Sequence, residues 1–234
     1  MFKNEAPPKK SDQTRERLYQ TALKMIAKKG FDATTMRAIA TEAGVAPGAT
    51  YYYFDSKEAL VYEYYKQSHT DHIRELGDFF AVEHEFGKRL HRAVRSKIET
   101  ALPYKNMARA LYRVAANPES PLSPFSEDSK ELRLQSLAIF REVVEGAKEK
   151  FAPELKAVLP EYLWMYQMGI ILFWIYDESK DSRRTFELID QTVPVIESMH
   201  QMIQSPLAAP FRGKILRLLK SFVPDLSATS AREE

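Results

Sequence analysis

The sequence predicts an all-α protein from three observations. Glycine is scarce, with 8 in 234 residues against an average share of about 7%, which disfavours a fold built from many tight turns. Apolar residues recur three and four positions apart through most of the chain, which is the period of a helix with one buried face. No segment shows the strict apolar and polar alternation of a half-buried strand.

Composition and charge exclude several classes of protein. The chain has no cysteine, so disulfides and cysteine-ligated zinc are excluded. Lys and Arg number 34 against 32 Asp and Glu, and the positive excess lies in residues 1–60. Met1–Lys10 has two prolines and no apolar run, so we expect no secretory signal and a cytoplasmic location. The longest apolar segment, 162–176, is shorter than the roughly 20 residues of a membrane span, so we expect no membrane partner.

The first predicted helix covers about residues 12–29. Its apolar residues share one face by their spacing: Leu18, Ala22, Met25 and Ile26. Gly30 follows, at the position where a left-handed residue commonly ends a helix.

Two short helices come next. Thr34 or Thr35 caps a helix over 36–44 that ends at Gly44. Pro47 opens a third, very short helix, because its missing N–H costs nothing at a first helical position. Two helices joined by a tight turn with glycine form a helix-turn-helix.

The rest of the chain also reads as helical. Ser56 caps a helix that continues to about Phe80. Residues 117–129 contain three prolines and are expected to form a loop. Further helices are predicted over about 85–101, 104–116, 130–150, 154–177, 183–204 and 208–222.

The third helix has a surface suited to phosphate groups. It is too short to fold alone, so Tyr53 and Phe54 must anchor it to its neighbours. This leaves five residues free to varying degrees to form an external surface: Pro47, Gly48, Ala49, Thr50 and Tyr52. Tyr51, Tyr52 and Lys57 place two phenol hydroxyls and an ammonium near helix N-termini, where phosphate oxygens bind well.

No catalytic or metal-binding motif accompanies this segment. The chain has no glycine-rich phosphate loop, no Gly-x-Ser-x-Gly and no His-Glu-x-x-His. His69 and His72 lie three apart on one predicted helix, but no third ligand follows at helical spacing. We therefore expect no catalytic residue, no metal and no cofactor.

Residues 11–60 resemble the DNA-binding domain of the TetR family of bacterial transcriptional repressors. The matching motif consists of Thr35, Ile39-Ala40, Ala43-Gly44-Val45, Gly48, Tyr51 to Phe54 and Ser56 to Leu60. The remaining three quarters of the chain agree with the family in length and helical character. Two positions depart from the family pattern: Ala46 stands where a helix-capping Ser is frequent, and Ala49-Thr50 replaces Thr-Leu.

The resemblance implies a double-stranded DNA operator as partner. Thr35, Tyr51, Tyr52 and Lys57 would contact phosphates, while Arg37, Gly48 and Ala49, beside the exposed Pro47, would face base edges in the major groove. Arg37 is the candidate for a bidentate contact to guanine. The implied domains are an arm over 1–10, a helix-turn-helix domain over 11–56, a ligand-binding and dimerisation domain over 57–223, and a tail over 224–234.

The resemblance also implies a pocket for a small-molecule effector in the C-terminal domain. Aromatic and methionine side chains are frequent there, which suits an apolar or aromatic effector. The candidate lining residues are Met107, Leu111, Tyr112, Phe140 and Tyr166. Composition alone does not separate such a lining from a filled core.

A homodimer is expected through two C-terminal helices. The helix over 183–204 has a coiled-coil-like apolar seam, and the helix containing 162–176 is apolar on every side. The predicted interface residues are Trp164, Met168, Ile171, Ile175, Phe186, Ile189, Val193 and Ile196.

These expectations describe a ligand-responsive dimeric regulator that is not an enzyme. It would repress from a palindromic operator and be released by its effector. The alternative is an all-helical binding protein or enzyme in which the N-terminal helices are only scaffold. The basic amphipathic helix over 208–222 packs on its own domain, clasps a partner or lies on a membrane, and the sequence leaves these open.

Overall fold

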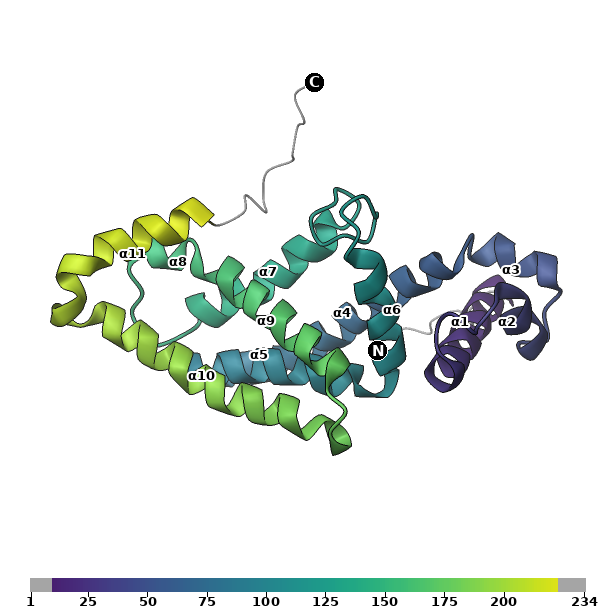
Figure 1. Ribbon diagram of the computed structural model, residues 1–234, viewed down its shortest axis with the longest axis horizontal. Helices are drawn as coiled ribbons and strands as arrows, with labels where there is room; N and C mark the ends of the chain where they lie inside the picture. The colour runs from purple at the N-terminus through teal and green to yellow at the C-terminus, as the bar shows by residue number, and fades with distance from the viewer. Residues whose placement is uncertain (1–9, 223–234) are drawn as a thin grey trace, which may run out of the picture. The chain divides into compact units, whose positions relative to one another are not determined.

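The computed structural model describes residues 10–222, which are helices, turns and loops with no strand among them (Figure 1). The all-α prediction is therefore confirmed for the described part of the chain. The predicted arm, apart from Lys10, and the predicted tail over 224–234 lie outside the described residues. The chain divides into two compact units, and each is described by itself.

Unit 1 comprises the chain up to Lys66 together with Pro103–Val114. This unit is larger than the predicted 11–56 domain, because the start of the fourth helix and most of the sixth pack with the N-terminal helices. Its elements are α1 (Lys10–Lys29), α2 (Met36–Glu42), α3 (Pro47–Tyr53), the first part of α4 (Lys57–Val82) and α6 (Lys105–Ala115).

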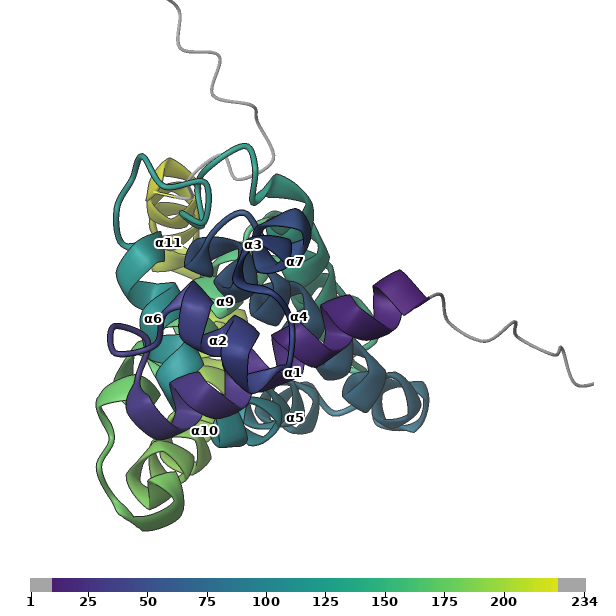
Figure 2. The same cartoon turned by 90° about the vertical axis from the view of Figure 1, so that its right-hand side faces the viewer.

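The core of unit 1 forms where α2 packs against both α1 and α3 (Figure 2). Leu18, Ile26 and Ile39 have no exposed surface there. Two predicted glycine ends are confirmed, since Gly30 has φ +83° and Gly44 has φ +65°, conformations that cost a residue with a Cβ atom.

Unit 2 comprises Gln67–Leu102 and the chain from Ala115 onward. Here α7 packs on α9, and α5 packs on both α7 and α10. Figure 1 shows α11 turning back from the end of α10. The elements are the rest of α4, α5 (Phe86–Ala101), α7 (Lys130–Glu145), α8 (Pro153–Lys156), α9 (Leu159–Tyr176), α10 (Arg183–Gln204) and α11 (Ala209–Phe222). Short 3-10 turns, η1 (Leu102–Tyr104), η2 (Lys180–Ser182) and η3 (Pro206–Ala208), precede α6, α10 and α11.

A buried arginine fixes the ends of two helices in unit 2. The guanidinium of Arg89 donates to the carbonyl oxygens of Phe80, Glu83 and Glu142 and lies over the Phe80 ring. These carbonyls belong to the C-terminal ends of α4 and α7, where the helix dipole favours a cation. The helix predicted over 130–150 therefore ends at Glu145, because Gly146 passes directly beside Arg89.

The helix predicted over 154–177 is interrupted. α8 ends at Lys156, and α9 begins at Leu159 with Pro160 in its first turn. Pro160 supports the start of a new helix, because proline fits the first turn and disfavours a helical residue before it.

Candidate nucleic-acid interface

The start of α2 is fixed by two threonines. Thr34 is buried and donates its hydroxyl to the carbonyl oxygen of Gly30 at 2.8 Å. Thr35 is exposed, and its Oγ1 accepts from the backbone N–H of Ala38 at 3.1 Å. Because Thr35 uses its oxygen as an acceptor, its hydroxyl hydrogen is left to donate outward, toward an acceptor such as a phosphate oxygen.

The turn between α2 and α3 is held by the backbone. The N–H groups of Gly44 and Val45 donate to the carbonyl oxygens of Thr41 and Ala40 at 3.1 and 2.9 Å. Ala46 precedes α3 without a side-chain cap. Because Ala46 stands where the family frequently has a capping Ser, no side chain covers the N-terminus of α3.

The side chains of α3 separate sharply into two faces. Thr50 is 1% exposed, so the expectation that it belongs to the external surface is wrong, and Phe54 is 3% exposed beneath the guanidinium of Arg15. In contrast, Tyr51 is 55% and Tyr52 81% exposed, and Tyr52 contacts the ring of Tyr53 edge to face.

Four exposed residues form one face of α3, which we call the α3 outer face: Pro47, Gly48, Tyr51 and Tyr52. Ala49 is half-buried beside it. The exposure of this face agrees with the sequence-based expectation for these four residues. Arg37 on α2 is also exposed, and its guanidinium has no hydrogen-bond or ion-pair partner within residues 10–222.

Lys57 has a role that the sequence reasoning missed. Its Nζ donates to the carbonyl oxygen of Phe31 at 3.0 Å and lies 4.3 Å from the centre of the Phe31 ring. The predicted phosphate ligand therefore also holds the loop between α1 and α2. An ammonium has three N–H donors, so this contact leaves donors for a phosphate.

The two ends of α6 hold the end of α1 and the loop that follows it within unit 1. Arg113 forms a two-point ion pair with Asp32 at 2.6 and 2.8 Å, and Asn106 donates to the carbonyl oxygen of Ala27 at 2.8 Å. The Arg113 guanidinium holds the pKa of Asp32 below its usual value. Sequence reasoning had no signal for these pairs, because their partners lie about 80 residues apart.

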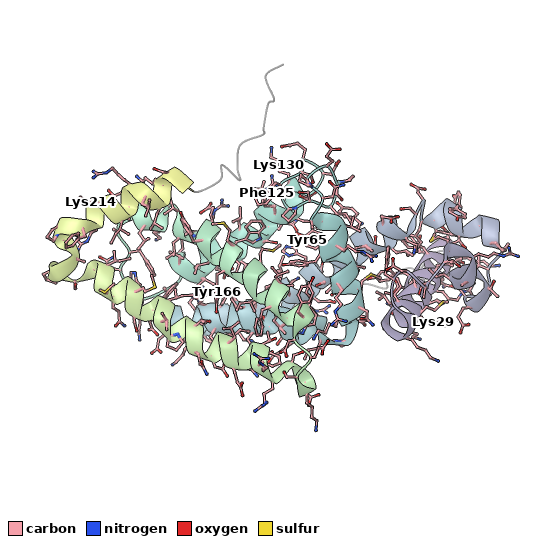
Figure 3. All side chains as sticks on the ribbon, viewed as in Figure 1. Lys29, Tyr65, Phe125, Lys130, Tyr166 and Lys214 are labelled. Carbon is pink, nitrogen blue, oxygen red and sulfur yellow. The ribbon has the colours of Figure 1, made fainter. Side chains whose placement is uncertain are left out.

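The predicted effector residues do not form one site within either unit. Met107, Leu111 and Tyr112 belong to unit 1, whereas Phe140 and Tyr166 belong to unit 2. Tyr166 shares a 2.6 Å hydrogen bond with Thr192 of α10, and Figure 3 shows it between these two helices. Tyr166 is thus a contact between α9 and α10.

The predicted dimer residues are mostly part of the core of one chain. Five of the eight are at most 9% exposed: Trp164, Ile171, Ile175, Ile189 and Val193. Met168, Phe186 and Ile196 are partly exposed. The apolar seam of α10 packs on α5 and α9 of its own chain, so a second copy cannot use its buried residues.

Other apolar side chains of the same two helices are exposed. On α9 they are Leu172, Phe173 and Tyr176, and on α10 they are Val195, Met199 and Met202. We call these six the α9/α10 outer face. The sequence-based interface thus names several side chains that the chain itself covers, because an all-apolar helix does not reveal which side its own chain covers.

The sequence predicts neither a membrane span nor a metal site. No helix within residues 10–222 is long and apolar enough to cross a membrane. In the same range, no group of three or more His, Asp or Glu side chains is arranged to hold a metal ion.

The fold and the α3 outer face define a helix-turn-helix protein with a helical C-terminal domain. The model for bacterial regulatory proteins of the tetR family matches residues 18–64, and the model described as a tetracyclin repressor-like C-terminal domain matches residues 89–210. The chain belongs to the TetR family of transcriptional regulators, which confirms the resemblance read from the motif.

Curated relatives match only a short part of the chain. The chain is 47% identical over 57 residues to the uncharacterized HTH-type transcriptional regulator YerO of Bacillus subtilis, which is 23% of this chain and 20% of that protein. It is 43% identical over 56 residues to the HTH-type transcriptional repressor KstR2 of Mycolicibacterium smegmatis, which is 24% of this chain and 27% of that protein. The match thus spans about a quarter or less of these relatives.

Solved structures share the fold over most of the chain. A putative TetR-family regulator from Syntrophomonas wolfei has a TM-score of 0.61 at 17% identity, covering 80% of this chain and 96% of that one. FadR of Thermus thermophilus, a TetR-family repressor in complex with lauroyl-CoA, has a TM-score of 0.56 at 21% identity, covering 76% and 92%.

Proposed function

We propose that the protein is a dimeric, ligand-responsive repressor that binds a palindromic operator through α2 and α3. The observation that carries this proposal is the α3 outer face, where two exposed tyrosines stand beside a backbone with little side-chain cover. Two buried residues, Thr50 and Phe54, fix α3 so that this face stays outward. We propose repression for this chain because its relative KstR2 and the structurally similar FadR are repressors.

The residues of the interface divide into two roles. Thr35, Tyr51, Tyr52 and Lys57 position the protein on phosphates, which adds affinity without reading sequence. Arg37, Gly48 and Ala49 face the base edges, and Arg37 has the donor geometry to read guanine.

Binding of a palindromic operator by helix-turn-helix units requires a dimer. Two helix-turn-helix units bind half-sites about one turn of DNA apart, so operator symmetry mirrors protein symmetry. We assign the dimer contact to the α9/α10 outer face. Its six exposed apolar side chains are the ones on these helices that the chain itself leaves uncovered.

We call α2 and α3 together the reading head. An effector would act by favouring one of two arrangements of the reading head. It can shift that equilibrium only by its difference in affinity for the two states. The chain passes from unit 2 into α6 of unit 1 at residues 102–103, and α6 holds the α1–α2 loop through Arg113 and the end of α1 through Asn106. We propose that this connection transmits effector binding, and that the effector is a small apolar or aromatic molecule.

A gel shift with the DNA flanking the protein's own gene tests this function. We expect one retarded complex containing two chains or a multiple of two, and competition by the same fragment but not by unrelated DNA. Equal retardation of unrelated DNA, or none of any fragment, would instead support the scaffold alternative, in which the N-terminal helices bind nothing.

A further inference from the structure

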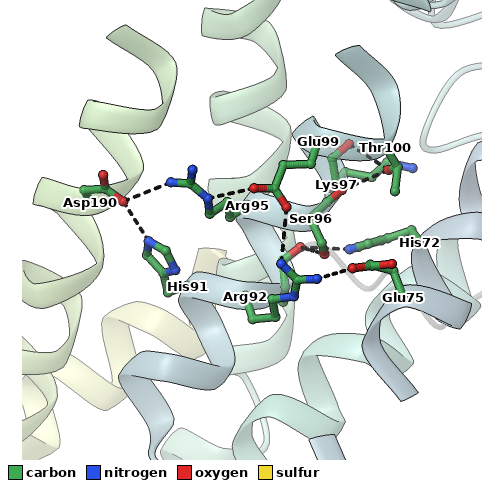
Figure 4. A network of polar contacts seen from close by, with 11 residues as sticks. His72, Glu75, His91, Arg92, Arg95, Ser96, Lys97, Glu99, Thr100 and Asp190 are labelled. Carbon is green, nitrogen blue, oxygen red and sulfur yellow. Dashed lines mark hydrogen bonds and ion pairs between the residues drawn. The ribbon is translucent and has the colours of Figure 1, made fainter. Parts of the chain in front are cut away.

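Three basic side chains lie together at the contact of α4 with α5 and α7 in unit 2. His69 and His72 of α4 are 2% and 1% exposed. His72 bonds through Nε2 to the carbonyl oxygen of Ala93 at 2.8 Å, and Lys97 donates to Ser68 Oγ at 3.0 Å. Figure 4 shows His72 and Lys97 in this region.

This cluster has no bonded carboxylate. Within residues 10–222, no Asp or Glu forms an ion pair with Lys97, His69 or His72, and Asp71, the nearest acidic influence on Lys97, pairs with Arg74. The neighbouring charged groups of α5 are occupied elsewhere, since Arg92 pairs with Glu75 and Glu99 (Figure 4). The cluster therefore carries basic groups with no carboxylate bonded to any of them.

His69 has one ring nitrogen without a partner. Ser136 donates its hydroxyl hydrogen to the carbonyl oxygen of Leu132 at 2.8 Å, so it can only accept at its long, 3.5 Å contact with His69 Nδ1. Nδ1 therefore carries the hydrogen, and Nε2 is an acceptor. That Nε2 is buried and has no hydrogen-bond partner, an unfavourable arrangement that native proteins mostly avoid.

The pKa values of the three basic groups are lowered, as expected for buried bases without a bonded anion. Burial, and secondarily the charge of Lys97, lowers the pKa of His69 to about 4 and that of His72 to about 3. Burial lowers the pKa of Lys97 to about 8. A bound anion would reverse these shifts, because an opposite charge favours the protonated form.

We propose that His69 and Lys97 bind the carboxylic acid end of an otherwise apolar effector. The carboxyl group passes its proton to His69 Nε2, and the resulting carboxylate accepts hydrogen bonds from the imidazolium and from the Lys97 ammonium. Buried apolar side chains continue from the cluster along the three helices: Leu76, Val94, Ile98, Leu137 and Phe140. Phe140, one turn beyond Ser136, is also a candidate from the sequence.

This assignment rests on the proposed function, since it names the chemical class of its effector. It also gives a physical route from the effector to the reading head. His69 lies on α4, whose first turns belong to unit 1.

Calorimetric titration of the full-length protein tests the assignment with dodecanoic acid, 4-phenylbutanoic acid and, as a neutral match, dodecan-1-ol. We expect at least one acid to bind, and dodecan-1-ol to bind at least tenfold more weakly than dodecanoic acid. Lys97→Met should weaken acid binding at least tenfold. Lys88→Met is the matched control, because Lys88 is an exposed lysine of the same helix, and it should bind as the unaltered protein does.

Two substitutions of His69 separate a binding role from a structural one. His69→Asn keeps a donor near the Nδ1 position and deletes the unpartnered acceptor, so it should lose acid binding without lowering the melting temperature. His69→Gln keeps a polar atom near Nε2 and should retain more acid binding than His69→Asn. A lower melting temperature for His69→Asn with unchanged acid binding would show that His69 is structural.

Three other results would overturn the inference: no binding of either acid, equal binding of dodecanoic acid and dodecan-1-ol, or equal effects of Lys97→Met and Lys88→Met. Operator binding is measured on the same preparations. A protein that shifts its operator but fails these tests keeps the proposed function and loses the effector assignment. One that binds acids but no DNA fragment refutes the proposed function instead.

Discussion

Arg113 of α6 and Asp32 of the α1–α2 loop form a bidentate ion pair, with Nη1 2.6 Å from Oδ2 and Nη2 2.8 Å from Oδ1. The pair is exposed, so it contributes little to stability. Its geometry nevertheless sets the position of the loop that leads into α2. Arg113 and Lys57 both lie against the ring of Phe31 in this loop. The pair thus connects α6 to the start of α2.

A double-mutant cycle measures this connection. We expect Asp32→Asn and Arg113→Gln each to weaken operator binding about fivefold, within the usual range of coupling between sites. The double substitution should cost no more than either single one, because both remove the same pair. Fully additive losses would show that the two residues act independently.

Arg37→Ala tests direct reading of bases. If Arg37 contacts guanine, its loss should cost about 1 to 3 kcal/mol of operator affinity and relax the preference at one base pair per half-site. Operator affinity and a base-pair substitution series measure the two effects. A uniform loss across all sequences would assign Arg37 to the phosphate backbone.

Lys57→Met should change the salt dependence of binding. Removing one phosphate contact lowers the slope of log affinity against log salt by about one unit. The same substitution removes the bond to the Phe31 carbonyl, so a lower melting temperature is also expected. A changed melting temperature with an unchanged slope would limit Lys57 to its structural role.

The connection between α9 and α10 gives a prediction for pH. Burial alone would raise the pKa of Asp177, but hydrogen bonds from Thr185 and Ser179 lower it to about 2. A carboxyl with a lowered pKa stabilises the fold above its unfolded value near 4, and this contribution disappears as the pH falls toward 2. Asp177→Asn should cost about 1 to 3 kcal/mol of stability at pH 7, and the difference from the unaltered protein should shrink below pH 4. A pH-independent difference would contradict this assignment.

Gly146→Ala tests the buried arginine. A Cβ atom at position 146 would collide with the guanidinium of Arg89, which already donates to three carbonyl oxygens. We expect a loss of about 1 to 3 kcal/mol, as for overpacking in other cores. Gly169→Ala is the control, since nothing lies near its Cβ position in the interior of α9, and it should not lower the melting temperature.

The local parts of this molecule could be predicted from the sequence. The ends of α1 and α2 follow from Gly30 and Gly44, and the start of α3 follows from Pro47, because each depends on backbone preferences of one residue. The inward position of Phe54 follows from the shortness of α3.

The long-range parts could not be predicted. The end of α7 depends on Arg89, more than 50 residues earlier. The exposed side of α9 depends on which of its apolar faces α7 and α10 cover, and every face of α9 is apolar. Which titratable groups lack partners, as His69 Nε2 does, emerges only from the packing of three helices.

Fluorescence anisotropy of a labelled operator duplex tests the central claim most directly. Removing both hydroxyls of the α3 outer face, by Tyr51→Phe with Tyr52→Phe, should weaken binding at least tenfold and leave the melting temperature unchanged, because both side chains are exposed. Tyr62→Phe, the same change at a partly exposed tyrosine of α4 that lies outside both named faces, should leave affinity as it is. Equal affinity of the double variant and the unaltered protein would contradict the assignment of α3 to the DNA.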